Sequence, residues 1–200
     1  IQDEALRSLL LEMISSRKKI RGLQGRFLAY PGREFKKIQG ERRLPLGSTV
    51  VKTEQSNTSV LYENIFYLKL YRRVSAGPNP DAEICRFLTE RAGVPYVPPF
   101  AGMIEYRRPG LETVVIGQLQ GFVSNQGDAW TYTVDRVRQY FEMVLSKNAD
   151  SGEIPATDAP LFDISFQAVP PLLQELIGAI YLEMAELLGR RTGEMHLALA

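Results

Sequence analysis

The sequence predicts an α+β fold, in which a small antiparallel sheet with flanking helices is followed by a helical segment. Two observations predict this class. Apolar residues alternate with a period of about two through much of residues 25–123, which is typical of strands. They recur at helical spacing before that region, within residues 2–16, and again after about residue 128.

The first half of the chain begins with a predicted amphipathic helix. Within Gln2–Ser16 the large apolar residues recur at helical spacing: Leu6, Leu9, Leu10, Met13 and Ile14. Short strands are predicted next, at residues 25–30, 33–41, 48–54, 59–62 and 65–73. Turns separate them, and the first is a Pro31-Gly32 turn.

The helix around residues 79–93 has the clearest ends in the sequence. Asn79 is a good N-cap, Pro80 suits the first helical position, and Gly93 followed by Pro95 ends the helix. The predicted apolar stripe of this helix consists of Ile84, Phe87 and Leu88, with Glu83 at its edge.

Two further strands, 97–108 and 111–123, precede the helical part. A helix is predicted from about Asp128 to Ser146, and residues 147–160 are typical of a loop. Pro170 and Pro171 then open a long helix in which Gly189 and Gly193 are possible breaks. The residues expected to point inward on the first of these helices are Val134, Val137, Phe141, Val144 and Leu145.

The composition is that of an ordinary globular chain, with 44% hydrophobic and 24% charged residues. No window reaches the roughly 18 apolar residues that a membrane-spanning helix needs, and a signal peptide is not apparent, so we expect a cytoplasmic location. One cysteine and one histidine exclude an internal disulfide and a Cys/His zinc site. Because the chain starts at Ile1 and stops inside an apolar pattern, we expect it to be a fragment.

The net charge is only +1, but it is distributed unevenly. Arg17 to Arg43 holds ten Lys/Arg residues against two Glu, whereas Lys147 to Ala200 holds three against eight Asp/Glu. The basic stretch fits either a nucleic-acid arm or, more simply, the solvated face of a small sheet.

Lys69 stands in the most apolar part of a predicted strand. Alternation puts Lys69 on one face between Tyr67 and Tyr71, and Glu83 follows on the capped helix. A strand lysine paired with a helix glutamate is the ground plan of the N-terminal lobe of a protein-kinase-like fold. On this pattern alone, a surface lysine and an exposed glutamate explain the same residues.

Five separated segments of the chain form a further set of motifs: "EQSNTSVLY", "LKLYRRV", "GPNPDAEICRFLTERAGVPYVPP", "LQGFVSNQGDAWTYTVD" and "LGRRTGEMHLALA". These motifs resemble bacterial maltokinases, particularly the kinase region fused behind trehalose synthase in some bacteria, and the likeness extends from about Leu6 to Ala200. It implies a two-lobed fold and ATP-dependent phosphorylation of maltose to maltose 1-phosphate.

The resemblance also implies the residues that bind the nucleotide. Lys69 would contact the ATP phosphates with Glu83 as its partner, and Tyr67 would contact the adenine. The phosphate loop would be Ser56, Asn57, Thr58 and Ser59, and the adenine-contacting hinge Gln120, Gly121, Phe122 and Val123. The corresponding parts are a cap-like region 1–46, an ATP-binding lobe 47–123 and a helical segment 124–200.

Two departures from the family pattern limit this interpretation. Ser124 replaces a proline in the hinge, and the catalytic base and the acids that hold Mg²⁺ are expected only after Ala200. The fragment alone is therefore predicted to be inactive, with no catalytic residue or metal ligand of its own and with maltose bound mainly by the missing lobe. His196, Cys85 and Trp130 are more simply interpreted as packing or surface residues.

A rival hypothesis is a non-catalytic kinase-like module that uses the basic sheet to bind an acidic partner or a fused trehalose synthase domain. The presence of both Lys69 and Glu83 favours the enzyme. We expect neither a nucleic-acid nor a membrane partner.

Overall fold

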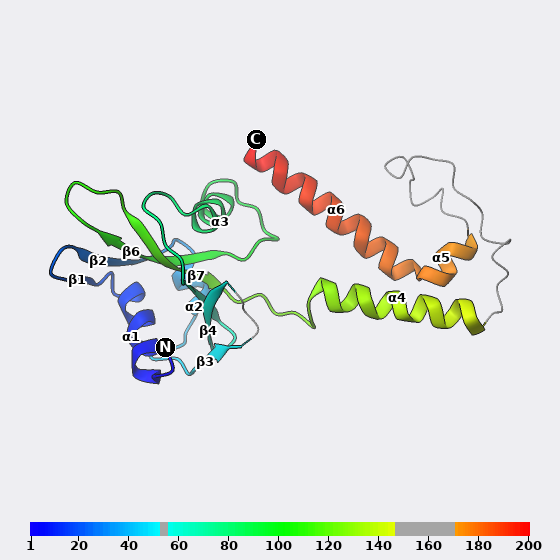
Figure 1. Cartoon of the computed structure of the whole chain (residues 1–200), viewed down its shortest axis with the longest axis horizontal. Helices are drawn as coiled ribbons and strands as arrows, with labels where there is room; N and C mark the ends of the chain where they lie inside the picture. Colours follow the sequence, from blue (N-terminus) through cyan, green and yellow to red (C-terminus); the bar gives the residue numbers. More distant parts are fainter. Residues whose placement is uncertain (53–55, 147–170) are drawn as a thin grey trace. The chain divides into compact units, whose positions relative to one another are not determined.

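The computed structural model describes residues 1–52, 56–146 and 171–200. It divides into two compact units, residues 1–124 and residues 125–200. The α+β class is confirmed, since an antiparallel sheet with flanking helices is followed by helices alone (Figure 1). The division by function into 1–46, 47–123 and 124–200 stays a prediction.

The first unit is built on one seven-stranded sheet in the order β1-β2-β6-β7-β5-β4-β3. All neighbouring pairs are antiparallel. The strands are β1 Lys19–Arg21, β2 Arg26–Pro31, β3 Ser48–Val51, β4 Asn57–Tyr62, β5 Phe66–Tyr71, β6 Phe100–Arg107 and β7 Val114–Gly121.

The hairpin of β4 and β5 confirms the two strands and short turn expected around Lys69. Its turn contains Glu63 and Asn64, whose φ angles of 45° and 54° lie in the left-handed region. The alternation along β5 is also confirmed, because Phe66 and Leu68 are completely buried whereas Lys69 is only partly buried.

Two helices cover opposite faces of this sheet (Figure 1). The helix α1, Glu4–Ser15, lies within the predicted range Gln2–Ser16 and has Asp3 as its N-cap. It packs on the larger core, which contains Phe66 and Leu68. The helix α3, Pro80–Glu90, packs on the other face. Its N-cap is Asn79, as predicted, because the Asn79 side chain accepts a hydrogen bond from the backbone N–H of Ala82.

The structure differs from the predicted strands at residues 33–41 and at residues 19–21. Residues 33–41 do not form a strand, because the short helix α2, Phe35–Gln39, lies there. Phe35 is buried and Ile38, three residues later, packs on the same core, so the two side chains share one face of a single helical turn. The strand β1 had not been predicted, and all three of its residues are exposed.

The second unit is helical, as predicted, and consists of α4 Ala129–Ser146, α5 Pro171–Ile177 and α6 Ala179–Leu199. Asp128 caps α4, since one of its carboxylate oxygens accepts a hydrogen bond from the N–H of Thr131 at 2.8 Å. The break in the long helix falls at Gly178 and not at the predicted Gly189 or Gly193, which lie within α6. The predicted loop 147–160 and Pro170 lie outside the described residues.

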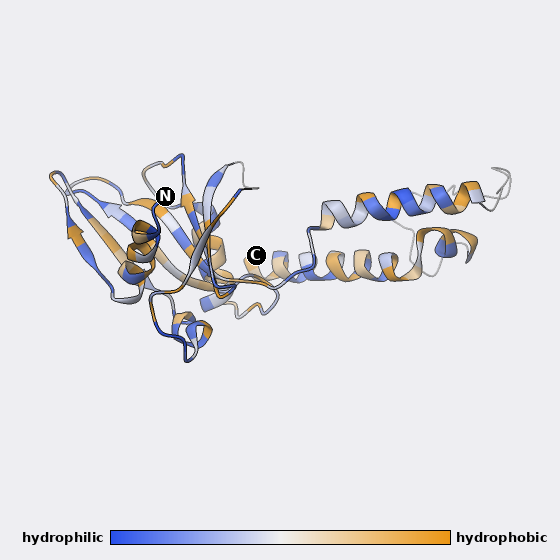
Figure 2. Cartoon of the chain, turned by 90° about the horizontal axis from the view of Figure 1, so that it is seen from below, coloured by the Kyte–Doolittle hydropathy of each residue, from blue (hydrophilic) through white to orange (hydrophobic). Residues whose placement is uncertain are grey.

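The predicted inward face of α4 is not buried within this unit. The exposed fractions of three of its residues are high: 48% for Val137, 58% for Phe141 and 75% for Leu145. Hydrophobic residues recur along α4 and α6 in Figure 2. Among the described residues, no helix combines the length and the apolar character needed to cross a membrane.

Candidate functional site at Lys69

Lys69 lies on the face of the sheet that α3 covers, in the middle of a row of paired residues. Ser59 on β4 is its partner on one side and Gln118 on β7 is its partner on the other. The Lys69 ammonium nitrogen is 3.3 Å from a carboxylate oxygen of Asp81, at the start of α3. Their side chains are 22% and 42% exposed, so the pair is fixed at the edge of the core but is not sealed from water.

The helix partner of Lys69 is therefore Asp81 and not the predicted Glu83. The stripe expected from Ile84 and Phe87 was wrong, because both are exposed in the structure. The buried residues of α3 are Ala82, Cys85 and Leu88. Asp81 precedes Cys85 by four residues and so shares its face, whereas Glu83 lies about 200° round the helix from Asp81.

The side-chain sizes explain why α3 turns this face to the sheet. Ala82 and Cys85 are small, so the helix can approach the strands closely, whereas larger side chains at these positions would hold it away. A prediction based on apolar character alone places the larger residues Ile84 and Phe87 on the buried face. The close approach brings the short Asp81 side chain within reach of Lys69.

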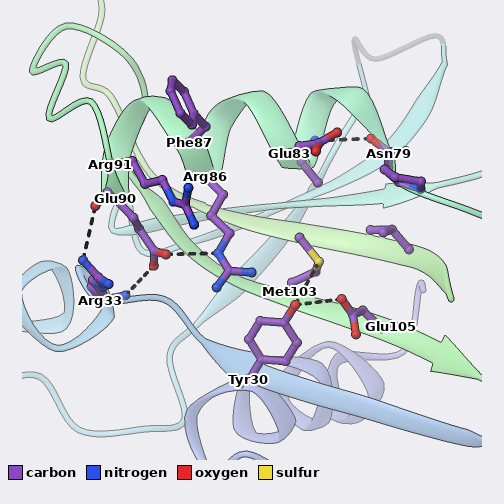
Figure 3. A pocket seen from close by; sticks show the side chains of 13 residues that line it. Tyr30, Arg33, Asn79, Glu83, Arg86, Phe87, Glu90, Arg91, Met103 and Glu105 are labelled. Carbon is purple, nitrogen blue, oxygen red and sulfur yellow. Dashed lines mark hydrogen bonds and ion pairs between the residues drawn. The ribbon is translucent and has the colours of Figure 1, made fainter. Parts of the chain in front are cut away.

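Glu83 instead lines a cavity of about 510 Å³ beside α3 (Figure 3). The same cavity is lined by Tyr30, Arg86 and Glu105, and Lys69 does not line it. Within the described residues, the Glu83 side chain makes no hydrogen bond or ion pair. Figure 3 shows Glu83 near Asn79, and the bond drawn there joins the backbone N–H of Glu83 to the carbonyl of Asn79.

The far end of α3 is anchored by Glu90, which fixes the rotation of the helix. One Glu90 carboxylate oxygen accepts a hydrogen bond from Arg86 Nε at 3.0 Å, and the other accepts one from the backbone N–H of Arg33 at 2.9 Å. The Arg86 guanidinium also lies 5.9 Å from the centre of the Tyr30 ring (Figure 3). These contacts support the orientation in which Asp81 faces Lys69.

The row around Lys69 contains buried polar atoms without partners. The Tyr71 hydroxyl lies 3.1 Å from Asp81 Oδ2 and 3.0 Å from Gln118 Oε1, but it can donate only one hydrogen bond. Among the described residues, Ser59 Oγ and Gln118 Nε2 have no hydrogen-bond partner. Buried polar atoms are rarely left unpaired. The two residues that flank Lys69 thus retain unused hydrogen-bonding capacity.

The residues predicted as a phosphate loop lie largely within a strand. Asn57, Thr58 and Ser59 belong to β4, and Ser59 is completely buried, so the prediction of a turn over Ser56–Ser59 was wrong. Ser56 is exposed directly before the strand, and residues 53–55 lie outside the described chain. Ser59 keeps a place in the site as the cross-strand neighbour of Lys69.

The predicted hinge is at the end of β7. Gln120 and Gly121 close the strand, and Phe122 and Val123 follow it directly. The N–H of Phe122 donates to the carbonyl of Ile65 at 2.8 Å. A Cβ atom at Gly121 would lie only 2.7 Å from a ring carbon of Pro99, so glycine permits this close approach.

Gln120 of the predicted hinge also contacts α3 and pairs with β5, the strand that carries Lys69. Gln120 Nε2 lies 3.5 Å from the sulfur of Cys85, and Tyr67 is the cross-strand partner of Gln120. Burial raises the pKa of the Cys85 thiol, in agreement with a packing role. The contacts of Gln120, Gly121, Phe122 and Val123 with a nucleotide stay a prediction, as do those of Lys69 and Tyr67.

Three tyrosines in the first unit should ionise only when the fold opens. Burial raises the pKa of Tyr30, Tyr62 and Tyr71 well above the ordinary value of 10.0. The native state holds these protons more tightly than the unfolded state does. Their contribution to the free energy of unfolding is therefore complete below pH 10 and is lost as the pH rises further.

An absorbance titration at 295 nm checks this expectation. We expect these three tyrosines to ionise only well above pH 10, together with the loss of far-ultraviolet circular dichroism. Ionisation of Tyr30, Tyr62 and Tyr71 near pH 10, with the fold intact, would contradict the burial of their hydroxyls.

The described residues contain no group of three or more His, Cys, Asp or Glu side chains that could hold a metal ion. Lys69 and its neighbours provide a partly exposed ammonium group that Asp81 holds on the sheet face. The unused polar atoms of Ser59 and Gln118 agree with a site that accepts a further polar group.

No family model matches the chain. Among solved structures, the chain is similar to one described as glucosamine kinase (crystal form B), with 14% sequence identity and a TM-score of 0.37. The match covers 72% of this chain and 43% of that chain, so this chain spans less than half the length of the protein it matches. This is a distant structural likeness to a sugar kinase.

Proposed function

We propose that residues 1–124 are the nucleotide-binding lobe of an ATP-dependent sugar kinase, with Lys69 as the residue that contacts the phosphates. The observation that carries this proposal is an ammonium group fixed on a sheet face by Asp81, a carboxylate of the adjacent helix. An ammonium has three N–H donors, so Lys69 can keep Asp81 and still offer donors to phosphate oxygens. The ion pair positions the charge before the nucleotide arrives.

In this proposal the acceptor is maltose and the product is maltose 1-phosphate, within a protein fused to trehalose synthase. The support for maltose is the likeness of the motifs around Lys69, α3 and the β7 end to maltokinases. Mg²⁺ would accompany ATP, and its ligands would come from outside the described residues. The role of this chain is to bind and orient the nucleotide.

Isothermal titration calorimetry of the 200-residue chain with ATP tests nucleotide binding directly. We expect ATP to bind with a stoichiometry of one and adenosine to bind much more weakly, because the phosphates supply the contact with Lys69. Absence of ATP binding by the folded chain would refute the proposal. For the acceptor, ³¹P NMR should detect maltose 1-phosphate when the protein containing this chain receives ATP and maltose, and glucosamine is the comparison sugar.

A double-mutant cycle can determine which carboxylate pairs with Lys69 in solution. We expect Lys69→Met and Asp81→Asn to show a coupling of about 0.5–1 kcal/mol in the free energy of unfolding, a modest value because both side chains are partly exposed. The effects of Lys69→Met and Glu83→Gln on the free energy of unfolding should be additive. Coupling to Glu83 in place of Asp81 would show that α3 has a different rotation on the sheet in solution.

A further inference from the structure

A second cationic surface lies far along the sheet, where β1, β2 and β6 meet the loop between β6 and β7. It encloses a cavity of about 750 Å³, lined by five cationic side chains and by no carboxylate. We call these five residues the basic cradle: Lys19, Arg21, Arg26, Arg107 and Arg108. The cradle shares none of its lining residues with the site at Lys69.

Three of these arginines stand side by side on consecutive strands. Arg21 of β1 is the register partner of Arg26 on β2, and Arg26 is the register partner of Arg107 on β6. Directly opposed residues in an antiparallel pair point to the same face, with Cβ atoms about 4.5–5.5 Å apart. The sheet therefore holds three guanidinium groups in one row.

This row is only partly neutralised within the molecule. Arg107 forms an ion pair with Glu105 at 2.7 Å. Within the described ranges 1–52, 56–146 and 171–200, the side chains of Arg21 and Arg26 have no ion pair or hydrogen bond. Like charges that face each other across strands destabilise a sheet. The guanidinium groups of the row therefore repel one another in the free protein, and a bound anion would reduce this repulsion.

The cradle is shaped by close backbone packing. A Cβ atom at Gly25 would lie 2.5 Å from the carbonyl oxygen of Arg107 and 2.8 Å from the Cγ of Arg108. Glycine therefore allows the turn between β1 and β2 to lie directly against the start of the β6–β7 loop. The backbone of the cationic residues is held on strands and tight turns, so only their side chains have to be ordered when an anion binds.

Two exposed leucines accompany the cations. Leu23 is fully exposed in the β1–β2 turn, and Leu111 is 58% exposed in the β6–β7 loop. Both line the cavity of the basic cradle. A small apolar contact area beside a group of arginines fits a protein interface, in which arginine is enriched and the buried centre is apolar.

We propose that the basic cradle binds an acidic segment of a partner protein. Guanidinium groups bind carboxylates in bidentate fashion, and four of the five cations are arginines. Lys19 and Arg21 are two residues apart on β1, hence about 6.7 Å apart, which is also the spacing of alternate side chains in an extended acidic segment. A flat bilayer does not fill a concave surface, and a nucleic-acid backbone makes no use of the leucines.

The test compares two double variants that each remove two arginine charges. Arg21→Gln with Arg26→Gln removes two of the three arginines of the row, whereas Arg42→Gln with Arg43→Gln removes two exposed arginines of the same basic stretch that do not line the cavity. The probe is a fluorescein-labelled decaglutamate peptide, and its binding to the full chain is followed by fluorescence anisotropy over a range of salt concentrations.

We expect the cradle variant to bind the peptide roughly tenfold more weakly and with a shallower salt dependence, because charge-assisted contacts are lost. The control variant should stay within about twofold of the parent chain. Without peptide, the melting temperature of the cradle variant should equal or exceed that of the parent, since the repulsion is relieved. An equal loss in both variants would overturn the proposal, as would tighter binding of duplex DNA or phosphatidylglycerol vesicles that depends on Arg21 and Arg26.

Discussion

Replacement of Lys69 by methionine should weaken the binding of ATP by roughly 10- to 150-fold, the range that corresponds to loss of a hydrogen bond to a charged group. Methionine keeps the apolar stem of the side chain but has no donor for a phosphate oxygen. It also leaves the Asp81 carboxylate without its cation, so a negative charge remains beside the phosphates. Both effects act in the same direction on the affinity.

Two variants make this measurement specific. Lys36→Met removes a charge from an exposed position on α2 and should leave the dissociation constant for ATP unchanged within about twofold. Lys69→Arg keeps the charge but changes the donor geometry, so we expect an intermediate affinity. Equal ATP affinity of the parent chain and the folded Lys69→Met variant, as measured by calorimetry, would show that the phosphates bind elsewhere.

The sequence was sufficient to predict the class of fold, the hairpin that carries Lys69 and the start of α3. Each of these follows from local chemistry. The period of two and the Glu63-Asn64 turn determine the hairpin, and Asn79 and Pro80 determine the start of the helix. The helix α4 was predicted for the same reason, because Asp128 caps its first turn.

The rotation of the helices on the sheet could not be predicted in this way. In α3 the predicted face contained Ile84, Phe87 and Leu88, but only Leu88 is buried, together with the small residues Ala82 and Cys85, because the sheet lies close beneath the helix. In α1, Leu6 and Leu9 are exposed while Arg7 is buried. Helix rotation depends on tertiary packing, and the rotation of α3 decides whether Asp81 or Glu83 meets Lys69.

The pairing register of the strands could not be predicted from the sequence either. The basic stretch from Arg17 to Arg43 was visible as a count of charges, but only the pairing of β1, β2 and β6 aligns Arg21, Arg26 and Arg107. Arg107 is distant in the sequence from that stretch. A surface that depends on three strands therefore appears only when the sheet is assembled.

Among the residues that the structure describes, Arg7 of α1 is a buried cation whose hydrogen-bond acceptors include no carboxylate. The residue is only 8% exposed, and it lies on the helix face shared with Leu11 and Ile14. Its Nε donates to Ser48 Oγ at 2.8 Å, and Nη2 donates to the Ser48 carbonyl at 3.1 Å. Nη1 donates to the carbonyls of Ile1 and Gln2 at 3.0 and 2.8 Å.

Arg7→Met should therefore lower the free energy of unfolding by about 2–4 kcal/mol, because hydrogen bonds to a charged group are worth about 1.5–3 kcal/mol net and several acceptors lose their donor together. The guanidinium bonds both to Ser48 of β3 and to the Gln2 carbonyl before α1. Its loss should therefore weaken the packing of the N-terminal segment on β3. A decrease of about 10 °C in the melting temperature is expected for a domain of this size.

Urea unfolding followed by far-ultraviolet circular dichroism measures this effect in the first unit, whose strands and α1 contribute to the signal. Arg42→Met is the matched control, since Arg42 is exposed and its replacement should change the free energy of unfolding by no more than about 0.5 kcal/mol. Equal stabilities of the two variants would mean that the four acceptors around Arg7 are satisfied by water in solution. A large decrease in the free energy of unfolding for Arg7→Met alone would establish that hydrogen bonds to uncharged carbonyl and hydroxyl oxygens stabilise the buried cation.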